Sequence, residues 1–267
     1  MGMIGNYFVH DTAIIETGAV IGENCHIGPF CVVGSGVHLG RSVRLLSHVV
    51  IAGETRVGDD TVIWPFASIG HQPQDLKYNG ENTQLIIGAR NKIRESVSIN
   101  PGTSNGGGLT KIGDDCLFML GSHVGHDCCL GNSVVVANNS AIAGHVTIGD
   151  NVNIGGLAGI HQFCRIGEGS MIGALAMITS DVIPFTTVAG ERPKLSGLNL
   201  IGLRRRGVSN ETLIQLKKFY NQMFNSNKNF KQQAKDILET GVANEYESQI
   251  ISFILAETKR SFLTTKK

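Results

Sequence analysis

The residues best suited to acid–base chemistry lie between Leu120 and Gly131, in the segment L-G-S-H-V-G-H-D-C-C-L-G. His126 is a candidate general base, because imidazole titrates near neutral pH and the adjacent Asp127 can orient the ring and stabilise its protonated form. Gly144, eighteen residues further along, is a candidate oxyanion donor through its backbone N–H. No serine or cysteine is evidently paired with this base, so the simplest scheme is direct attack by a substrate hydroxyl that His126 deprotonates.

A six-residue repeat surrounds these residues. From Ile15 to Ile69 an aliphatic residue recurs every six positions, usually followed by glycine. The same phase resumes from Ile87 to Ile99, and a second phase, shifted by one residue, runs from Ile112 to Ile178. The residue two positions before each aliphatic one is nearly always small or β-branched, so two inward positions recur in every six residues.

A period of six fits neither a helix nor a long strand, and it is typical of parallel β-helices. Each hexad is then one short strand plus a turn, three hexads make a coil of eighteen residues, and successive coils pair in parallel. We expect the glycine after each aliphatic residue to supply backbone freedom at the corner. A sandwich of unrelated strands would instead need a turn signal every ~8 to 12 residues.

Two insertions rich in Gly, Pro and Asn, at 71–86 and 100–111, interrupt the repeat and are expected to be loops. Because three hexads make one coil, every third hexad lies on the same face of the prism. When hexads are numbered from Ile15, both insertions and the histidine segments follow hexads of the series first, fourth, seventh and so on, so they leave the same edge. Parallel strands lie ~4.8 Å apart, so we expect a column of residues along one edge of the prism. The residues predicted to line or overhang this groove are His126, Gly144, His145, His161 and Gln162, with Gln74, Asp75 and Lys77 above them.

Composition narrows the class of protein. The chain has 267 residues and a net charge of +1, which favours no nucleic-acid partner. No apolar run reaches the ~18 residues of a membrane span, and the first residues do not resemble a signal peptide, so we expect a cytoplasmic protein. Five of the six cysteines fall on the small inward position and are expected to fill the core rather than form disulfides: Cys25, Cys31, Cys116, Cys128 and Cys164.

Two other interpretations of the histidines remain open. His123 and His126 form an H-x-x-H pair, and His145 and His161 fall close in the column, as in a zinc site. Residues three apart on a strand and turn do not share a face, however, so a metal is not favoured. The histidines can also simply line an edge that packs against another subunit.

The repeat fades after Ile178, and we divide the chain into a β-helix at 1–190 and an α-helical part at 191–267. Helices are expected over 211–225, 228–240 and 245–262 from their apolar spacing. A local basic cluster suits an acidic carrier protein or a diphosphate, although a solvated face is the alternative. Its members are Lys194, Arg204, Arg205, Arg206, Lys217 and Lys218.

The chain resembles the UDP-N-acetylglucosamine acyltransferases, a family of left-handed β-helix enzymes, along nearly its whole length. The motifs that carry the resemblance are H-I-G-P-F-C-V-V-G at 26–34, Q-D-L-K-Y at 74–78, I-R-E-S-V at 93–97, G-G-G-L-T at 106–110, H-V-G-H-D-C at 123–128, A-G-H-V at 143–146, I-H-Q-F-C at 160–164 and G-L-R-R-R-G at 202–207. The hexads alone indicate only the superfamily, whereas Q-D-L-K-Y with H-x-x-H-D and the triple arginine is far more specific.

The resemblance implies transfer of a 3-hydroxyacyl chain from acyl carrier protein to the glucosamine 3-hydroxyl of UDP-N-acetylglucosamine, the first step of lipid A synthesis, without a cofactor. It implies a left-handed coil and homotrimers with sites between subunits. His126 matches the family's base, Asp127 its partner and Gly144 the oxyanion donor. Substrate contacts are implied for Asp75, Lys77, His123, His145, His161, Gln162, Asn199, Arg205 and Arg206, and a role in acyl-chain length for Met171 and Ala174.

Two positions depart from the family pattern: Arg192 stands where His is frequent and Ile201 where Glu is frequent. They concern acyl-chain length and contacts near the uracil rather than the chemistry. Two alternative activities are an N-acyltransferase of the same pathway and a γ-type zinc hydratase. The first carries a globular domain before its solenoid, whereas here the hexads begin by Ile15, and the second needs three histidine ligands.

Overall fold

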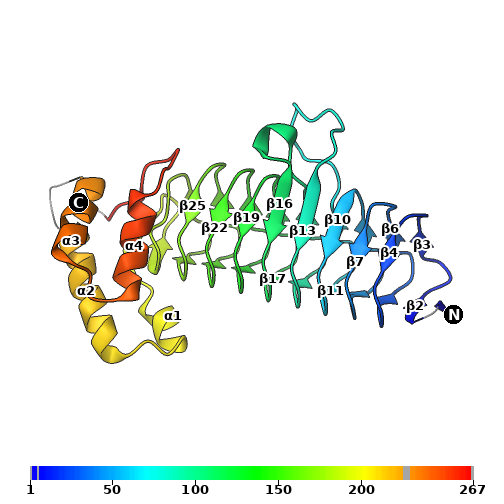
Figure 1. Ribbon diagram of the computed structural model, residues 1–267, viewed down its shortest axis with the longest axis horizontal. Helices are drawn as coiled ribbons and strands as arrows, with labels where there is room; N and C mark the ends of the chain where they lie inside the picture. Colours follow the sequence, from blue (N-terminus) through cyan, green and yellow to red (C-terminus); the bar gives the residue numbers. More distant parts are fainter. Residues whose placement is uncertain (1, 5, 225–228, 266–267) are drawn as a thin grey trace.

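The computed structural model describes residues 2–4, 6–224 and 229–265, and Figure 1 shows a long column of short strands followed by helices. The strands form three sheets, one along each face of the column. Apart from the antiparallel pairs β1–β2 and β28–β29 at the ends, neighbouring strands in the sheets are parallel. The architecture is the parallel β-helix that the hexads predict.

The first sheet has twelve strands, β1 (Gly2–Ile4), β2 (Tyr7–Val9), β5 (His26–Ile27), β8 (Arg44–Leu45), β11 (Val62–Ile63), β14 (Lys92–Ile93), β17 (Leu117–Phe118), β20 (Val135–Val136), β23 (Asn153–Ile154), β26 (Met171–Ile172), β28 (Thr186–Ala189) and β29 (Lys194–Leu198). The second has eight, β4 (Val20–Ile21), β7 (His38–Leu39), β10 (Glu54–Val57), β13 (Gln84–Ile87), β16 (Leu109–Ile112), β19 (Cys129–Leu130), β22 (Thr147–Ile148) and β25 (Arg165–Ile166). The third has nine, β3 (Ile14–Ile15), β6 (Val32–Val33), β9 (Val50–Ile51), β12 (Ser68–Ile69), β15 (Ser98–Ile99), β18 (His123–Val124), β21 (Ala141–Ile142), β24 (Gly159–Ile160) and β27 (Met177–Ile178).

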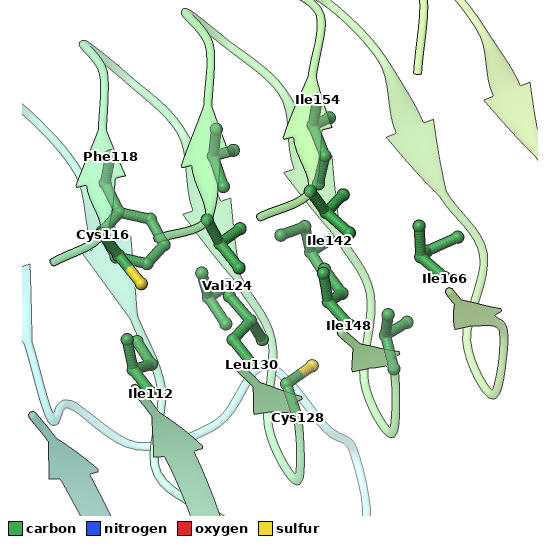
Figure 2. Close-up of a cluster of buried hydrophobic side chains, with 14 of the residues drawn as sticks. Ile112, Cys116, Phe118, Val124, Cys128, Leu130, Ile142, Ile148, Ile154 and Ile166 are labelled. Atoms are coloured by element: carbon green, nitrogen blue, oxygen red, sulfur yellow. The ribbon is translucent and has the colours of Figure 1, made fainter. Parts of the chain in front are cut away.

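The repeated aliphatic residues form the core of the column. Figure 2 shows Val124, Leu130, Ile142 and Ile148 among the side chains that fill the interior, one layer per coil. Cys116 and Cys128 lie among them. All five cysteines predicted to point inward are buried, which confirms that they are core residues, whereas Cys129 is exposed. All six are free thiols.

The corners work differently from the expectation. The left-handed backbone falls three residues after the aliphatic position, where eighteen non-glycine residues of the described chain have φ between 51° and 65°. The glycine directly after the aliphatic residue serves close packing instead. A Cβ on Gly28, for example, would overlap the carbonyl oxygen of Leu46 in the next coil. Within the described chain, the expectation that this glycine provides backbone freedom therefore holds only at Gly70, with φ of 76°, and is wrong at the others, where glycine is needed because coils approach closely.

Both insertions leave the third sheet, after β12 and β15, which confirms the edge deduced by counting hexads. They project together from the column beside β13 and β16 (Figure 1). The insertions are shorter than expected, because Gln84–Ile86 and Leu109–Lys111 belong to lengthened strands that pair with each other. The second insertion contains a short 3₁₀ helix, Ser104–Gly106.

Four helices follow the strands: α1 (Leu200–Arg205), α2 (Asn210–Phe224), α3 (Phe230–Thr240) and α4 (Glu245–Leu255). Strand β29 and helix α1 were not expected in this part. The predicted ends of two helices at Asn225 and Lys228 lie outside the described residues. The third helix ends at Leu255 rather than Phe262, because the chain turns back onto the column, where Asp181 and Phe262 form a β-bridge. In the described part of the chain, every helix falls short of the length and apolar character that a membrane span requires.

Candidate active site

His126 and Asp127 occupy the corner that follows β18. Asp127 takes one of the left-handed corner positions, with φ of 57°. Its Oδ2 lies 2.7 Å from Nδ1 of His126, and the two side chains are 1% and 15% exposed. Because a carboxylate only accepts hydrogen bonds, it holds the imidazole proton on Nδ1 and leaves a lone pair on Nε2. The ring is therefore arranged as a general base.

The second insertion holds Asp127 in place. The backbone N–H of Thr103 donates to Oδ1 of Asp127 at 2.9 Å, and the Thr103 hydroxyl donates to Oδ2 at 2.6 Å. The Asp127 N–H donates in turn to Oγ1 of Thr110 at 2.8 Å. Gly106 packs so closely that a Cβ there would overlap the carboxylate. The sequence reasoning missed Thr103, although a threonine in a loop on the shared edge was an available signal.

Gly144 lies one coil above His126, as the spacing predicts. The His145 N–H donates to the His126 carbonyl at 2.9 Å, which ties the two coils together at this corner. A Cβ built on Gly144 would lie 2.6 Å from both Cε1 and Nε2 of His126, so the glycine faces the basic nitrogen directly. A backbone N–H at such a place is suited to hold the oxyanion of a tetrahedral intermediate.

A cavity of about 520 Å³ opens beside His126. His123, His161 and Gln162 line it, together with Gln74 from the first insertion. Its floor runs along the outward residues of β21, β24 and β27, which are Ala141, Gly159 and Met177. Ala141 and Gly159 leave room above this apolar floor, and the Met177 thioether lies over Gly159, where an added Cβ would meet its Sδ at 3.2 Å.

Asp75 and Lys77 lie on the same insertion as Gln74 but outside the lining of this cavity. The Lys77 N–H donates to Oδ1 of Asp75 at 3.0 Å, which shapes the loop. Asp75 is nevertheless close enough to His145 to favour its protonated form. The structure thus brings Asp75 near the column, whereas Lys77 is exposed.

Two histidines beside the base are held towards neutrality. Burial lowers the pKa of His123, and the neighbouring His126 adds to this effect. Burial also lowers the pKa of His145, against an opposing effect of Asp127. The His145 ring stands edge-on to His126 and stacks on Phe163, with centroids 4.5 Å apart. Burial raises the pKa of the Cys128 thiol to about 12, so it is no nucleophile.

A second group of predicted site residues lies on a different face of the column. Asn199 and Arg205 line a cavity of about 420 Å³ with Met171 on the first sheet. Asn199 caps α1 by accepting from the Gly202 N–H at 3.0 Å. Arg206 forms an ion pair with Glu168 at 2.8 Å. A single chain therefore does not bring these residues to His126.

The remaining residues predicted to affect chain length, Ala174 and Arg192, are exposed and line neither cavity. Ile201, the other departure from the family pattern, is 64% exposed on α1 and lines the cavity that contains Met171. Ile201 thus lies with the second group, whereas the residue before Arg192, Glu191, accepts from the Met177 N–H of β27 at 3.4 Å, next to the cavity beside His126.

Among the described residues, one set of side chains comes close enough to share a metal ion: His126, Asp127 and His145. His123 and His161 do not join it, so the three histidines of a hydratase-type zinc site do not converge. Both oxygens of Asp127 already accept hydrogen bonds from Thr103. The donors at this corner thus suit proton transfer better than metal coordination.

Known proteins resemble this chain closely. One family profile, described as Udp N-acetylglucosamine O-acyltransferase, domain 2, matches residues 181–263, and another, described as bacterial transferase hexapeptide (six repeats), matches residues 145–180. An acyl-[acyl-carrier-protein]--UDP-N-acetylglucosamine O-acyltransferase of Paracoccus denitrificans is 53% identical over 202 residues, which cover 76% of either chain. A protein of the same name from Rhizobium johnstonii is 41% identical over 95% of this chain and 93% of its own.

A solved structure of the same family also matches this chain. The crystal structure of a UDP-N-acetylglucosamine acyltransferase matches with a TM-score of 0.94 at 43% identity, covering 97% of this chain and all (100%) of the other. This similarity shows that the β-helix is left-handed, as the sequence resemblance implied.

Proposed function

The chain belongs to the family of acyl-[acyl-carrier-protein]--UDP-N-acetylglucosamine O-acyltransferases, and from this premise we propose how its residues carry out the reaction. The enzyme transfers an acyl chain from acyl carrier protein to UDP-N-acetylglucosamine, the first step of lipid A synthesis. In our proposal the chain is a 3-hydroxyacyl group and the acceptor is the 3-hydroxyl of the glucosamine. Because a nucleotide sugar and a carrier protein are cytoplasmic substrates, we place the enzyme in the cytoplasm.

His126 starts the reaction as a general base. Its Nε2 takes the proton of the sugar hydroxyl while the hydroxyl oxygen attacks the thioester carbonyl, and Asp127 stabilises the resulting imidazolium. The Gly144 N–H donates to the oxyanion of the tetrahedral intermediate. When the intermediate collapses, the C–S bond breaks and the thiolate takes the proton back from His126. No acyl-enzyme forms, and the thioester supplies its own activation.

One observation carries this proposal: the His126–Asp127 pair, fixed by Thr103, lies directly below Gly144. The base and the oxyanion donor thus face one cavity from successive coils. The apolar floor of this cavity, at Ala141 and Gly159, suits the hydrocarbon of the acyl donor.

The test is an acyl-transfer assay with UDP-N-acetylglucosamine and a panel of 3-hydroxyacyl carrier proteins. We expect His126→Ala to lower turnover at least ~100-fold, the scale of general-base catalysis. His38→Ala is the matched control, because His38 is exposed on β7, several coils away. Normal turnover by His126→Ala would remove this residue from the mechanism, and absence of transfer by the wild-type protein with every donor would refute the activity itself.

We propose that the enzyme is a homotrimer with its active sites between subunits. The cavity around Asn199 and Arg205 lies on the first sheet, along β20, β23 and β26, and the cavity beside His126 runs along β21, β24 and β27 of the same coils. A threefold rotation about an axis parallel to the column would bring the cavity around Asn199 of one subunit to the cavity beside His126 of its neighbour. Leu76, fully exposed (104%) at the tip of the first insertion, also suits contact with a neighbouring subunit.

Mixing subunits tests this arrangement. His126→Ala and Arg205→Ala proteins are unfolded together, refolded and assayed. If sites are shared, mixed trimers contain sites in which both residues are intact, and activity rises well above that of either parent. Activity that stays at the sum of the parents would place both residues in one subunit's site and contradict the proposal.

We assign acyl-chain length to Met171, Ala174 and Arg192 and carrier-protein docking to the basic cluster that includes Arg204 and Lys217. The Met171 side of the second cavity and the apolar floor at Gly159 would together enclose the chain in a trimer. A shift of the preferred donor length in Met171→Ala, measured across the donor panel, supports this assignment, and an unchanged preference contradicts it.

A further inference from the structure

The segment that follows α4 returns to the β-helix and reaches the active-site edge. The Leu263 N–H donates to the Asp181 carbonyl and the Asp181 N–H to the Ser261 carbonyl, both at 2.8 Å. The Thr258 hydroxyl donates to Oδ2 of Asp181 at 2.6 Å. These bonds fix the backbone on either side of Arg260 against the last coils of the column.

From this position, the Arg260 side chain contacts the corner that carries His161. Its Nε donates to the Gln162 carbonyl at 3.1 Å, and its Nη2 lies 2.7 Å from Nδ1 of His161. His161 and Gln162 line the cavity that contains His126. A residue close to the C-terminal end, ninety-nine positions from His161, thus touches the wall of the active site.

The chemistry of this contact decides the tautomer of His161. Nδ1 of His161 also lies 3.3 Å from the Gln162 carbonyl, but the guanidinium is nearer, and because it stays protonated and offers only donors, Nδ1 accepts. The proton of the neutral imidazole then sits on Nε2. At His126 the opposite holds, because the carboxylate of Asp127 keeps the proton on Nδ1. Neighbours of opposite charge thus hold two histidines of one cavity in opposite tautomers.

We propose that Arg260 is a positioning residue that keeps His161 in the Nε2–H tautomer, as a donor to an acceptor oxygen of the bound substrates. His126 is then the histidine available to abstract a proton, and His161 binds. The nature of the substrates rests on the function proposed above, whereas the tautomer follows from the contact itself.

Nitrogen NMR of protein labelled with ¹⁵N-histidine tests the tautomer without any turnover. The His161 signals are identified by their absence in His161→Gln. We expect the Nε2–H pattern in the wild-type protein and in the control Lys231→Met, which removes an exposed cation that shares a cavity with Arg260. Arg260→Met should show a mixture of tautomers. An Nδ1–H pattern in the wild-type protein, or an unchanged pattern in Arg260→Met, would overturn the proposal.

A double-mutant cycle tests whether Arg260 acts through His161. Loss of a hydrogen bond to a charged group should lower kcat/KM ~10-fold in Arg260→Met. In the His161→Gln background the same change should cause no further loss, because the partner is already absent. Equal losses in both backgrounds would refute a role through His161. Because the NMR result needs no substrate, failure of the proposed reaction and failure of this inference remain distinguishable.

Discussion

At the scale of residues, the site depends on how each histidine is held. Asp127 orients His126, Ser98 contacts Nδ1 of His123 at 2.8 Å, and Phe163 stacks on His145. The sequence identified the histidines and Asp127, since their positions in the repeat place them on one edge. It did not identify their partners, because Ser98 and Thr103 resemble ordinary turn and strand residues until the coils are stacked.

Thr103→Val should lower turnover ~10-fold, since a hydrogen bond to a charged group contributes ~1.5–3 kcal/mol and part of the support remains in the Thr103 N–H. Thr103→Ser keeps the hydroxyl and is the control. Steady-state kinetics of both variants check the prediction. Equal turnover of the valine and serine variants would show that the hydroxyl does not support Asp127.

The low pKa of His123 makes the fold sensitive to acid. Burial places this pKa below its ordinary value of 6.5, so below about that pH the unfolded chain binds more protons than the folded one. The stabilisation is complete above pH 6.5 and declines as the pH falls through this value. His123→Gln should therefore lose less stability than the wild-type protein between pH 7.5 and pH 5.5, by urea unfolding. His145 is present in both proteins and contributes equally to their loss of stability. An equal loss of stability in the wild type and in His123→Gln would therefore contradict the prediction.

At the scale of elements, the close stacking of coils determines the geometry of the candidate site. Corner glycines let one coil approach the next, and Gly144 lets the chain pass beside the imidazole of His126. The hexad period predicted the strands, their sheets and this juxtaposition. It did not predict β29, α1 or the end of α4, because these elements obey no repeat.

Gly144→Ala should lower kcat by ~100-fold, because the added Cβ at 2.6 Å displaces the His126 ring, and a misplacement of ~1 Å costs that much. Gly156→Ala is the matched control, since its Cβ would meet only the Asn138 carbonyl at 3.4 Å. Thermal unfolding of both variants should stay close to that of the wild type. A Gly144→Ala enzyme as active as Gly156→Ala would contradict the tight fit at the base.

At the scale of the whole molecule, the helical part is fastened to the column at Asp181. This buried carboxylate accepts from Nε of Arg165 at 2.7 Å and from Thr258 at 2.6 Å. The contact could not be predicted, because it joins segments 77 positions apart that share no pattern. The separation between His126 and the group around Asn199 and Arg205 could not be predicted from the sequence either, since it depends on which face of the column each element occupies.

Asp181→Ala should destabilise the protein by about 3–5 kcal/mol, the loss expected when one partner of a buried ion pair is removed. Arg165 would keep its charge without the carboxylate, although the ring of Phe253 beneath it remains. Asp59→Ala, which removes the partner of the exposed Arg41, is the control and should change stability little. Denaturant unfolding followed by helical circular dichroism measures both, and similar effects would contradict the prediction.

The left-handed corners also allow aspartates of the same backbone conformation to be compared within one protein. Asp60, Asp115 and Asp127 share φ values of 57°, 59° and 57°, so one residue type recurs on one backbone shape in three surroundings. Asp60 and Asp115 are exposed, whereas the Asp127 side chain is 1% exposed. Any difference in how these carboxylates titrate thus reports their environment alone, with local conformation held constant within a single polypeptide.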